Sequence, residues 1–446
     1  MTGTKSVWVT AQDVGSRPLK EPSLDEASRA AGTSMAVTAF PAATEAALGI
    51  LRDGGNAVDA AAAASWVLSV CEPSGSGLGG QATMLIHFPD GRSVVLDGHS
   101  HGPASLSRNA VSRAQQRYGF CACTVPSHPA TLGAAVQRFG RLPLAASIAP
   151  AADMADRGVT VTRLLRRHIQ WCGEALVSTP ATARIFLPGG HPPEIGFALR
   201  QPELARTLRR IAAHGVEDFY EGSLSRDIVT DMESHGGLIT AEDLRCLQLP
   251  VVRETIATIY RGHKVISVPA PGGGPQVLLG LNLLESLFPA AEPDDSPAWY
   301  GMLARVIQAV FRERVRWPID PEGVAPSLWN WLLGTERARE IAAEIAGPTP
   351  LPACRSAEGP GDTTHLCVAD PDGLVVSLTQ SIQSLFGAKV MNEKLGFMYN
   401  NYLCTCPRYR HPSRLGPNAL PQSNAAPTIV FAAGSRRIPQ LVLGAA

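Results

Sequence analysis

The chain has 446 residues, with 39 Lys and Arg against 39 Asp and Glu, so its formal net charge is zero. A nucleic-acid-binding protein normally carries a basic excess, so this balance argues against that class. Hydrophobic residues make up 45% of the chain and charged residues 17%, which favours one large or two smaller globular domains with a sizeable core over a disordered chain.

The cysteine content and the length of the apolar runs indicate where in the cell the protein is located. There are nine cysteines, an odd number, and no Cys-x-x-Cys pair. This spacing does not match a zinc site, so we expect reduced, mostly buried thiols and no bound metal. The first 18 residues hold no apolar stretch of signal-peptide length, and the run Ala60–Cys71 is shorter than the roughly 20 residues that span a bilayer. We therefore predict a cytoplasmic protein with no membrane partner.

The first hundred residues predict a strand, two helices and a hairpin. Residues 1–31 are polar and predict a loose leader before a strand that begins at Met35. A helix follows Pro41 and ends at the glycine pair 54–55. The Ala-rich run Ala57–Val70 is nearly apolar on all sides and predicts a buried helix. Beyond it, the segments 84–88 and 93–96 flank a Pro-Asp-Gly-Arg turn and predict a β-hairpin.

The rest of the chain predicts helices followed by a linker and a second hairpin. Residues 204–213 and 304–315 have helical amphipathic spacing, and we expect Arg312, Arg314 and Arg316 to lie on a solvated helix face. Residues 347–362 are rich in Pro, Gly and polar residues and predict an exposed linker. The segments 365–369 and 374–379 then predict two buried strands joined by an Asp-Pro-Asp-Gly turn.

The glycine-rich segment Gly75–Gly80 contains the spacing of a dinucleotide-binding loop. Such a loop needs a strand before the glycines and a helix after them, because the helix N-terminus holds the pyrophosphate. Here the order is reversed, with a helix before and a strand after. We therefore interpret the glycines as a close backbone crossing rather than a nucleotide site.

The junction between the linker and the second hairpin is a candidate catalytic site. It delivers Thr363 to the start of a buried strand. If the bond between Asp362 and Thr363 is cut, the new α-amine has a reference pKa of about 7.7 to 8.0 and can act as general base for the hydroxyl of the same residue. Threonine also has a high β-propensity, so a Thr-Thr pair is common at the start of a strand. The sequence spacing alone therefore leaves open whether Thr363 is catalytic or only part of the strand.

Several segments together resemble the γ-glutamyltranspeptidase family. The segment Asp362–Thr379 resembles the start of the family's small subunit, and further matches lie in the family's order along the chain. These matches are Asp53–Ala61, Gly77–Gly80, Gly237–Leu244 and Ala426–Val430. The resemblance implies an α+β fold, a four-layer αββα sandwich of the N-terminal-nucleophile (Ntn) hydrolases, with no metal or organic cofactor.

The same resemblance implies the domain organisation and the catalytic residues. Residues 1–362 would form the large subunit and residues 363–446 the small one, with Thr363 as nucleophile after cleavage at Asp362 and the two fragments remaining associated. Ser381 stands where the family has a hydroxyl that hydrogen-bonds the nucleophile, and Thr379 lies two residues earlier on the same face of its strand. The alternative for both is a polar pair on a solvent-facing strand.

The candidate substrate-binding residues depart from the family pattern. His99 stands where the family has an Arg that clamps the substrate α-carboxylate, and imidazole cannot replace a guanidinium fork. Asn401 is kept, but Cys404 stands where an Asp holds the substrate α-amine. Gln383 follows the second strand in place of an Asn. The family's paired serines appear here as Ser423 and Asn424.

Three functional hypotheses follow from these matches and departures. The first is γ-glutamyl transfer to water or an amine, the second is a relative with a changed acyl substrate in antibiotic biosynthesis, and the third is a member that never cleaves itself. The alternative to a changed substrate is that His99 and Cys404 are substitutions without effect on the substrate, and that a nearby arginine such as Arg408 supplies the charge. Because Gln440–Ala446 stops where the family continues into a Gly-Gly oxyanion hole, we also expect a shortened version of a longer protein.

Overall fold

The computed structural model describes residues 34–107, 109, 111–247, 250–288, 295–320, 326–347, 363–435 and 437–444. The predicted leader, Asp362 and nearly all of the predicted linker lie outside these residues. Two antiparallel sheets form the centre of the fold. The larger sheet has the strand order β1 (Met35–Thr38), β9 (Thr364–Ala369), β10 (Val375–Ser381), β2 (Gln81–His87), β3 (Ser93–Gly98) and β6 (Val251–Glu254). The smaller sheet has the order β12 (Pro439–Leu443), β11 (Thr428–Phe431), β8 (His263–Ser267) and β7 (Ile256–Tyr260).

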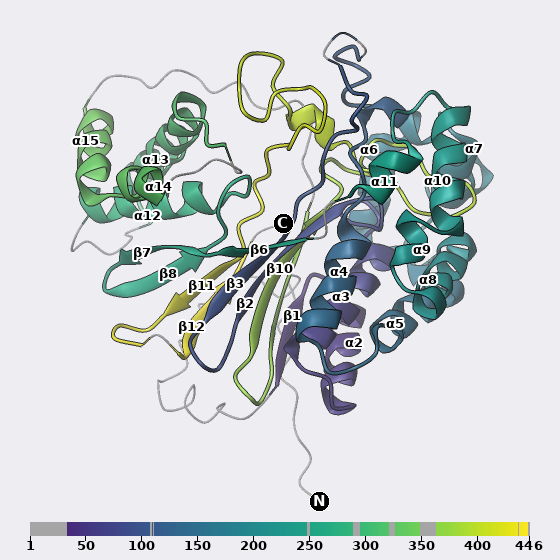
Figure 1. The fold of residues 1–446 in the computed structure, drawn as a ribbon, viewed down its shortest axis with the longest axis horizontal. Helices are drawn as coiled ribbons and strands as arrows, with labels where there is room; N and C mark the ends of the chain where they lie inside the picture. Colours follow the sequence, from purple (N-terminus) through teal and green to yellow (C-terminus); the bar gives the residue numbers. More distant parts are fainter. Residues whose placement is uncertain are drawn as a thin grey trace, which may run out of the picture.

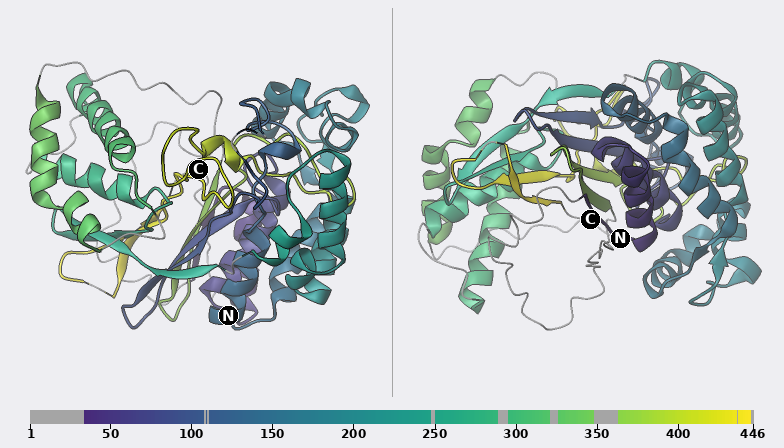
Figure 2. Two further views of the ribbon diagram at one scale, coloured as in Figure 1. Left: turned by 45° about the horizontal axis from the view of Figure 1, so that its top comes forward. Right: turned by 90° about the horizontal axis from the view of Figure 1, so that it is seen from below.

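Helices cover the outer face of each sheet, as Figures 1 and 2 show. Against the larger sheet lie α2 (Pro41–Arg52), α3 (Ala57–Cys71) and α4 (His128–Phe139), and α5 (Leu144–Arg157) and α8 (Pro202–His214) pack outside them. Around them lie α6 (Arg163–Leu176), α7 (Pro180–Phe186), α9 (Glu217–Tyr220), α10 (Ser223–Ser234), α11 (Ala241–Arg245) and the strand pair β4 (Val159–Thr160) and β5 (Ala198–Leu199). Against the smaller sheet lie α12 (Gly274–Leu287) and α14 (Pro326–Leu332), and α13 (Pro297–Arg316) and α15 (Thr335–Ala346) pack on α12. The predicted αββα sandwich is therefore confirmed.

Alternation along the strands explains this layering. On β10, Val376 and Leu378 join the core beneath the helices, whereas Val375 joins a separate core between the two sheets. Successive strand residues point to opposite faces, so each inner strand supplies both cores. The predicted hairpins are confirmed, with β2 beginning three residues earlier than expected and β3 ending two residues later.

The predicted buried helix is also confirmed as α3, in which every residue is buried. Its start is fixed by a reciprocal cap. The Asn56 side chain accepts hydrogen bonds from Val58 N at 2.9 Å and Asp59 N at 3.1 Å, and the Asp59 carboxylate accepts one from Asn56 N at 3.0 Å. This cap satisfies backbone donors that would otherwise be orphaned at a buried helix end.

The glycine-rich segment is a close backbone crossing, as the order of elements predicts. A Cβ on Gly79 would lie 2.1 Å from the carbonyl oxygen of Met398, and a Cβ on Gly80 would lie 2.3 Å from that of Ser381. Only glycine fits such approaches. The crossing packs the turn after α3 directly against the end of β10.

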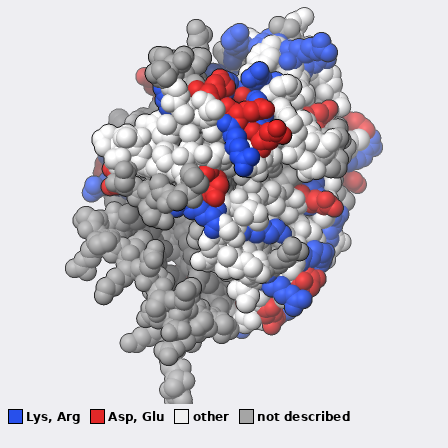
Figure 3. Space-filling view, turned by 90° about the vertical axis from the view of Figure 1, so that its left-hand side faces the viewer, with Lys and Arg blue, Asp and Glu red and all other residues white. Residues whose placement is uncertain are grey.

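The face on the α15 side of the molecule carries intermixed charges (Figure 3). Lys and Arg side chains lie among Asp and Glu rather than forming a field of one sign. Between α13 and α15, for example, Arg312 pairs with Glu344 at 2.7 Å. A surface of this kind lacks the basic footprint of a nucleic-acid interface.

Candidate active site

The space between the two sheets changes from apolar to polar toward one end. Val375 begins the inner face of β10, and Ser377, Thr379 and Ser381 follow it on the same face. The register places Thr379 opposite both Thr83 of β2 and His365 of β9, and Ser381 opposite Gln81. The polar end therefore lies where β10 ends and β9 begins.

Thr363 lies at this polar end, immediately before β9. Its Oγ1 donates a hydrogen bond to Ser381 Oγ at 3.2 Å, and Ser381 Oγ also accepts one from Gln383 N at 2.8 Å. Gln383 has φ of 85°, a left-handed conformation that folds its backbone back onto Ser381. The structure thus brings together three of the residues that the sequence proposed.

Thr379 contacts a histidine rather than the candidate nucleophile. Its Oγ1 lies 2.8 Å from His365 Nδ1, and the other ring nitrogen lies 3.2 Å from Cys367 Sγ and 3.4 Å from Ser377 Oγ. Burial lowers the pKa of His365 to about 4, so the imidazole is neutral at pH 7. Thr379 therefore supports β9 through His365.

A second buried histidine lies on the opposite face of β10. His128 Nε2 lies 3.0 Å from Ser65 Oγ on α3, and the Ser65 hydroxyl also hydrogen-bonds Gln380. Burial lowers the pKa of His128 to about 4, and its ring packs edge-on against Trp66. These polar contacts join α3 and α4 to the strand that carries Ser381.

We expect both histidines to make the protein less stable in mild acid. An unfolded imidazole binds a proton near its ordinary pKa of about 6.5, whereas folded His128 and His365 bind one only near pH 4, so the unfolded state holds more protons in between. The free energy of unfolding should therefore fall as the pH drops from about 6.5 to about 4, by up to about 3 kcal/mol for each histidine. Urea unfolding at pH 7 and pH 4.5 measures the difference. His128→Gln should reduce it, whereas His191→Asn on an exposed turn should not; equal pH dependence in wild type and His128→Gln would contradict the assignment.

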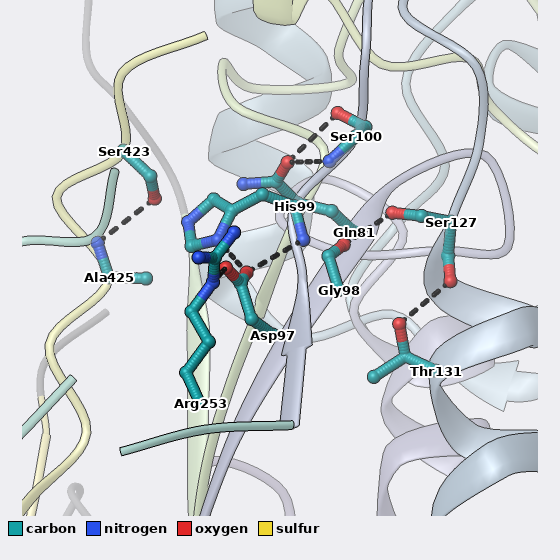
Figure 4. A network of polar contacts seen from close by, with 10 residues as sticks. All are labelled: Gln81, Asp97, Gly98, His99, Ser100, Ser127, Thr131, Arg253, Ser423 and Ala425. Atoms are coloured by element: carbon teal, nitrogen blue, oxygen red, sulfur yellow. Dashed lines mark hydrogen bonds and ion pairs between the residues drawn. The ribbon is translucent and has the colours of Figure 1, made fainter. Parts of the chain in front are cut away.

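His99 lies at the end of β3 in a buried charge network (Figure 4). The Asp97 carboxylate accepts hydrogen bonds from His99 N at 3.1 Å, from His99 Nδ1, and from Arg253 Nε at 2.6 Å. Burial raises the pKa of Asp97, but His99 and Arg253 outweigh burial and hold this pKa well below its usual range. His99 Nε2 is buried and has no hydrogen-bond partner among the described residues.

This geometry fixes what His99 can offer to a ligand. Because Nδ1 is hydrogen-bonded to Asp97, Nε2 is the ring nitrogen that can hydrogen-bond a ligand. The ring points toward the segment that carries Ser423 (Figure 4). Gln81, between Ser381 and His99 in the sheet, has its Oε1 occupied by Ser100 N at 2.9 Å and Ser100 Oγ at 2.8 Å.

The other proposed substrate-binding residues have partners within the protein. Asn401 Nδ2 donates to Arg117 O at 3.0 Å and to Ser384 Oγ at 3.1 Å, so this side chain holds the turn after Gln383. Ser423 Oγ is buried and accepts a hydrogen bond from Ala425 N at 3.1 Å. Asn424 is exposed, and it lies at the rim of the site rather than in its buried part.

The expectation that Arg314 solvates a helix face is wrong. Its guanidinium donates to Asn424 Oδ1 at 2.7 Å and to Ser423 O at 3.0 Å. Burial lowers the pKa of Arg314 to about 10. Helical periodicity placed this residue on an outer face, but the face is covered by a segment more than a hundred residues later in the chain.

Tyr402 is a site residue that the sequence did not reveal. It is buried, and its hydroxyl interacts with the side chains of Ser381, Gln81 and Ser423. Burial raises the pKa of the phenol, which therefore stays neutral and can donate a hydrogen bond. In the sequence, Tyr402 is marked only by its place directly after the pair Asn400 and Asn401.

The described parts of the chain hold no group of three or more His, Cys, Asp or Glu side chains arranged for a metal ion. In the same parts, none of the helices has the length and apolar character needed to cross a membrane.

Comparison with known proteins agrees with this arrangement. A family model described as gamma-glutamyltranspeptidase matches residues 43–446. The chain is 36% identical over 386 residues to the acylase ACY 1 proenzyme of a Pseudomonas species, covering 83% of this chain and 69% of that protein. It is 30% identical over 418 residues to the glutathione hydrolase proenzyme of Escherichia coli, covering 88% and 72%.

A solved structure shows the same fold. The crystal structure of cephalosporin acylase from Bacillus halodurans superposes with a TM-score of 0.81 at 30% identity, covering 92% of this chain and 77% of that one. With the sandwich and with Thr363 against Ser381 at the polar end of the inter-sheet space, these matches show that the chain is an Ntn-hydrolase enzyme that belongs to the γ-glutamyltranspeptidase family.

Proposed function

We propose that the protein is an acylase in which Thr363 transfers an acyl group from an amide donor to water or an amine. The observation that carries this proposal is the hydrogen bond from Thr363 Oγ1 to Ser381 Oγ, which positions a hydroxyl nucleophile at the polar end of the inter-sheet space. The identity with an acylase proenzyme supports an amide donor.

Self-cleavage would come first. The Thr363 hydroxyl attacks the carbonyl carbon of Asp362, the amide becomes an ester as the nitrogen leaves with a proton, and water hydrolyses the ester. The products are a carboxylate on Asp362 and a free amine on Thr363. The fragments should stay associated, because β9 and β10 lie between β1 and β2 in one sheet and β11 pairs with β8 in the other.

Catalysis would then use the new amine as general base. The amine takes the hydroxyl proton while Oγ1 attacks the donor carbonyl carbon, and the leaving amine receives the proton as the ester forms. Water or an acceptor amine attacks the ester, and the hydroxyl is restored. In this scheme Ser381 orients Oγ1, and Gln383 and Tyr402 hold Ser381.

The surroundings of the nucleophile support a donor without a free α-amino acid end. A γ-glutamyl group carries a carboxylate and an ammonium, and burying both without charged partners is costly. Here His99 is tied to Asp97, and Cys404 offers a thiol that burial keeps protonated by raising its pKa. Neither group replaces a guanidinium or a carboxylate.

The test is kcat/KM on γ-glutamyl p-nitroanilide beside p-nitroanilides of acyl chains that lack the α-amine. We expect the γ-glutamyl donor to be turned over about 10²-fold less efficiently or worse. His99→Arg should gain γ-glutamyl turnover, and His191→Arg on the surface should not. Efficient turnover of the γ-glutamyl donor by the wild type would contradict the changed-substrate proposal.

The second candidate is γ-glutamyl transfer itself. The identity with the Escherichia coli glutathione hydrolase favours it, as does Arg253, which brings a guanidinium next to His99 through Asp97. A cytoplasmic location and a role in antibiotic biosynthesis stay predictions.

A further inference from the structure

A cavity of about 660 Å³ borders the loop that joins Tyr402 to Ser423, which is drawn in yellow-green at the top of Figure 1. Its volume lies within the roughly 300 to 1,000 Å³ that is usual for small-molecule sites. The described residues that line it include none of the groups placed around Thr363. The cavity therefore has a lining of its own.

The loop presents a fixed shape to this cavity. Leu415 N donates to Pro407 O at 2.8 Å, and Ser413 N donates to His411 Nδ1 at 2.9 Å. The side chains of His411, Ser413 and Leu415 are buried, and Leu415 packs with Ala419 in an apolar cluster beneath the loop. These contacts tie down every second residue over this stretch, so the residues between them are left to face outward.

Arginines gather on the outward face of the loop. Arg410 and Arg414 alternate with the buried residues, are exposed, and line the cavity together with Arg408. Arg408 is held in place, because its Nη1 donates to Val111 O at 2.8 Å and to Gln116 Oε1 at 3.3 Å. The guanidinium groups of Arg410 and Arg414 form no ion pair with a carboxylate of the described residues. Both can therefore bind an anion from solution.

The lining carries a surplus of positive charge. Its described residues include three arginines and one acidic residue, Asp320, which leaves a surplus of two positive charges. The chain as a whole has equal numbers of basic and acidic residues, so this surplus is local. A cavity with cations on its walls concentrates anions. Several guanidinium groups suit an anion that carries more than one charge, because each can form a paired hydrogen bond with two of its oxygens.

An aromatic ring lies among these cations. Tyr409 stands between Arg408 and Arg410 in the chain, lines the same cavity and is 58% exposed. The flat face of an exposed tyrosine can stack on the ring of a nucleobase, whichever base it is. The cavity therefore combines cations for phosphate groups with a ring for a base.

We propose that this cavity binds a free nucleoside diphosphate, with its phosphate groups on Arg410 and Arg414 and its base against Tyr409. This inference goes beyond the proposed function, because binding at this site involves neither Thr363 nor an acyl group. The pyrophosphate supplies the multiple negative charges that the surplus of arginines requires.

Dissociation constants for ADP, inorganic pyrophosphate and adenosine, measured by equilibrium dialysis on the purified protein, test the site. We expect ADP to bind more tightly than pyrophosphate, and adenosine to bind most weakly. Arg410→Gln and Arg414→Gln should each weaken ADP binding about tenfold or more. Arg226→Gln is the matched control, because Arg226 is an exposed arginine on α10, and it should leave the dissociation constant unchanged.

A fourth variant separates the two parts of the ligand. Tyr409→Ala should weaken ADP binding about tenfold and leave pyrophosphate binding unchanged. No binding of ADP, or equal affinity in the wild type and both arginine variants, would overturn the proposal. Citrate binding as tightly as pyrophosphate would overturn the assignment to phosphate groups. None of these measurements needs turnover, so their outcome is independent of the proposed acylase activity.

Discussion

Thr363→Ala is expected to abolish both self-cleavage and acyl transfer. Without Oγ1 no group remains at this position to attack the carbonyl carbon of Asp362 or of a donor, and loss of a nucleophile typically costs about 10⁴-fold or more in kcat. Gel electrophoresis should show one band for the variant. Release of p-nitroaniline from any accepted donor should fall to background.

The neighbouring threonine is the matched control. Thr364 is fully buried, faces the helix side of the sheet opposite Gln380, and its Oγ1 has no partner among the described residues. Thr364→Val replaces this unpaired hydroxyl with a methyl group of the same shape, so it should cleave itself and keep its activity. Loss of cleavage in Thr364→Val but not in Thr363→Ala would show that the nucleophile is assigned to the wrong residue.

Asp97→Ala is expected to cause a large loss of stability. The variant leaves the guanidinium of Arg253 without its buried carboxylate and His99 without the acceptor that orients its ring. Breaking a buried ion pair by removing one partner costs about 3–5 kcal/mol. Urea unfolding at pH 7 measures this loss.

Asp90→Ala provides the comparison. Asp90 is 66% exposed and its ion pair with Arg92 spans 3.9 Å, so its removal should change the free energy of unfolding by about 1 kcal/mol or less. Equal losses in the two variants would contradict the structural role of the network around Asp97.

Much of the fold could be predicted from the sequence because its signals are local. The nearly all-apolar run of α3 and the turn residues of both hairpins are local patterns that specify these elements. The glycines at 79 and 80 mark a place where two backbone segments approach closely. The strand alternation that separates the two cores is likewise visible in β10, where apolar and hydroxyl side chains alternate over residues 376–379. The layered arrangement can then be predicted, because each helix and sheet must bury its apolar face against another element.

The polar contacts of the site could not be predicted in the same way. Arg253 meets Asp97 across 156 residues of chain, and Arg314 meets Asn424 across 110, so neither pair leaves a local pattern. Lys389 is another example, because its sequence neighbourhood gives no sign that the side chain is buried. Motif matching found Thr363 and Ser381 because they lie at the start of β9 and the end of β10, whose sequences are recognisable. The groups that surround them come from separate elements far apart in the chain, such as Gln81 on β2 and Tyr402.

Intact mass and N-terminal sequencing of the purified wild-type protein test the central claim most directly. Cleavage before Thr363 predicts two associated fragments of 362 and 84 residues, about 38 and 9 kDa of the 47.1 kDa chain, with the smaller one beginning Thr-Thr-His. A single polypeptide of full mass after prolonged incubation would contradict this account and favour a member of the family that never cleaves itself.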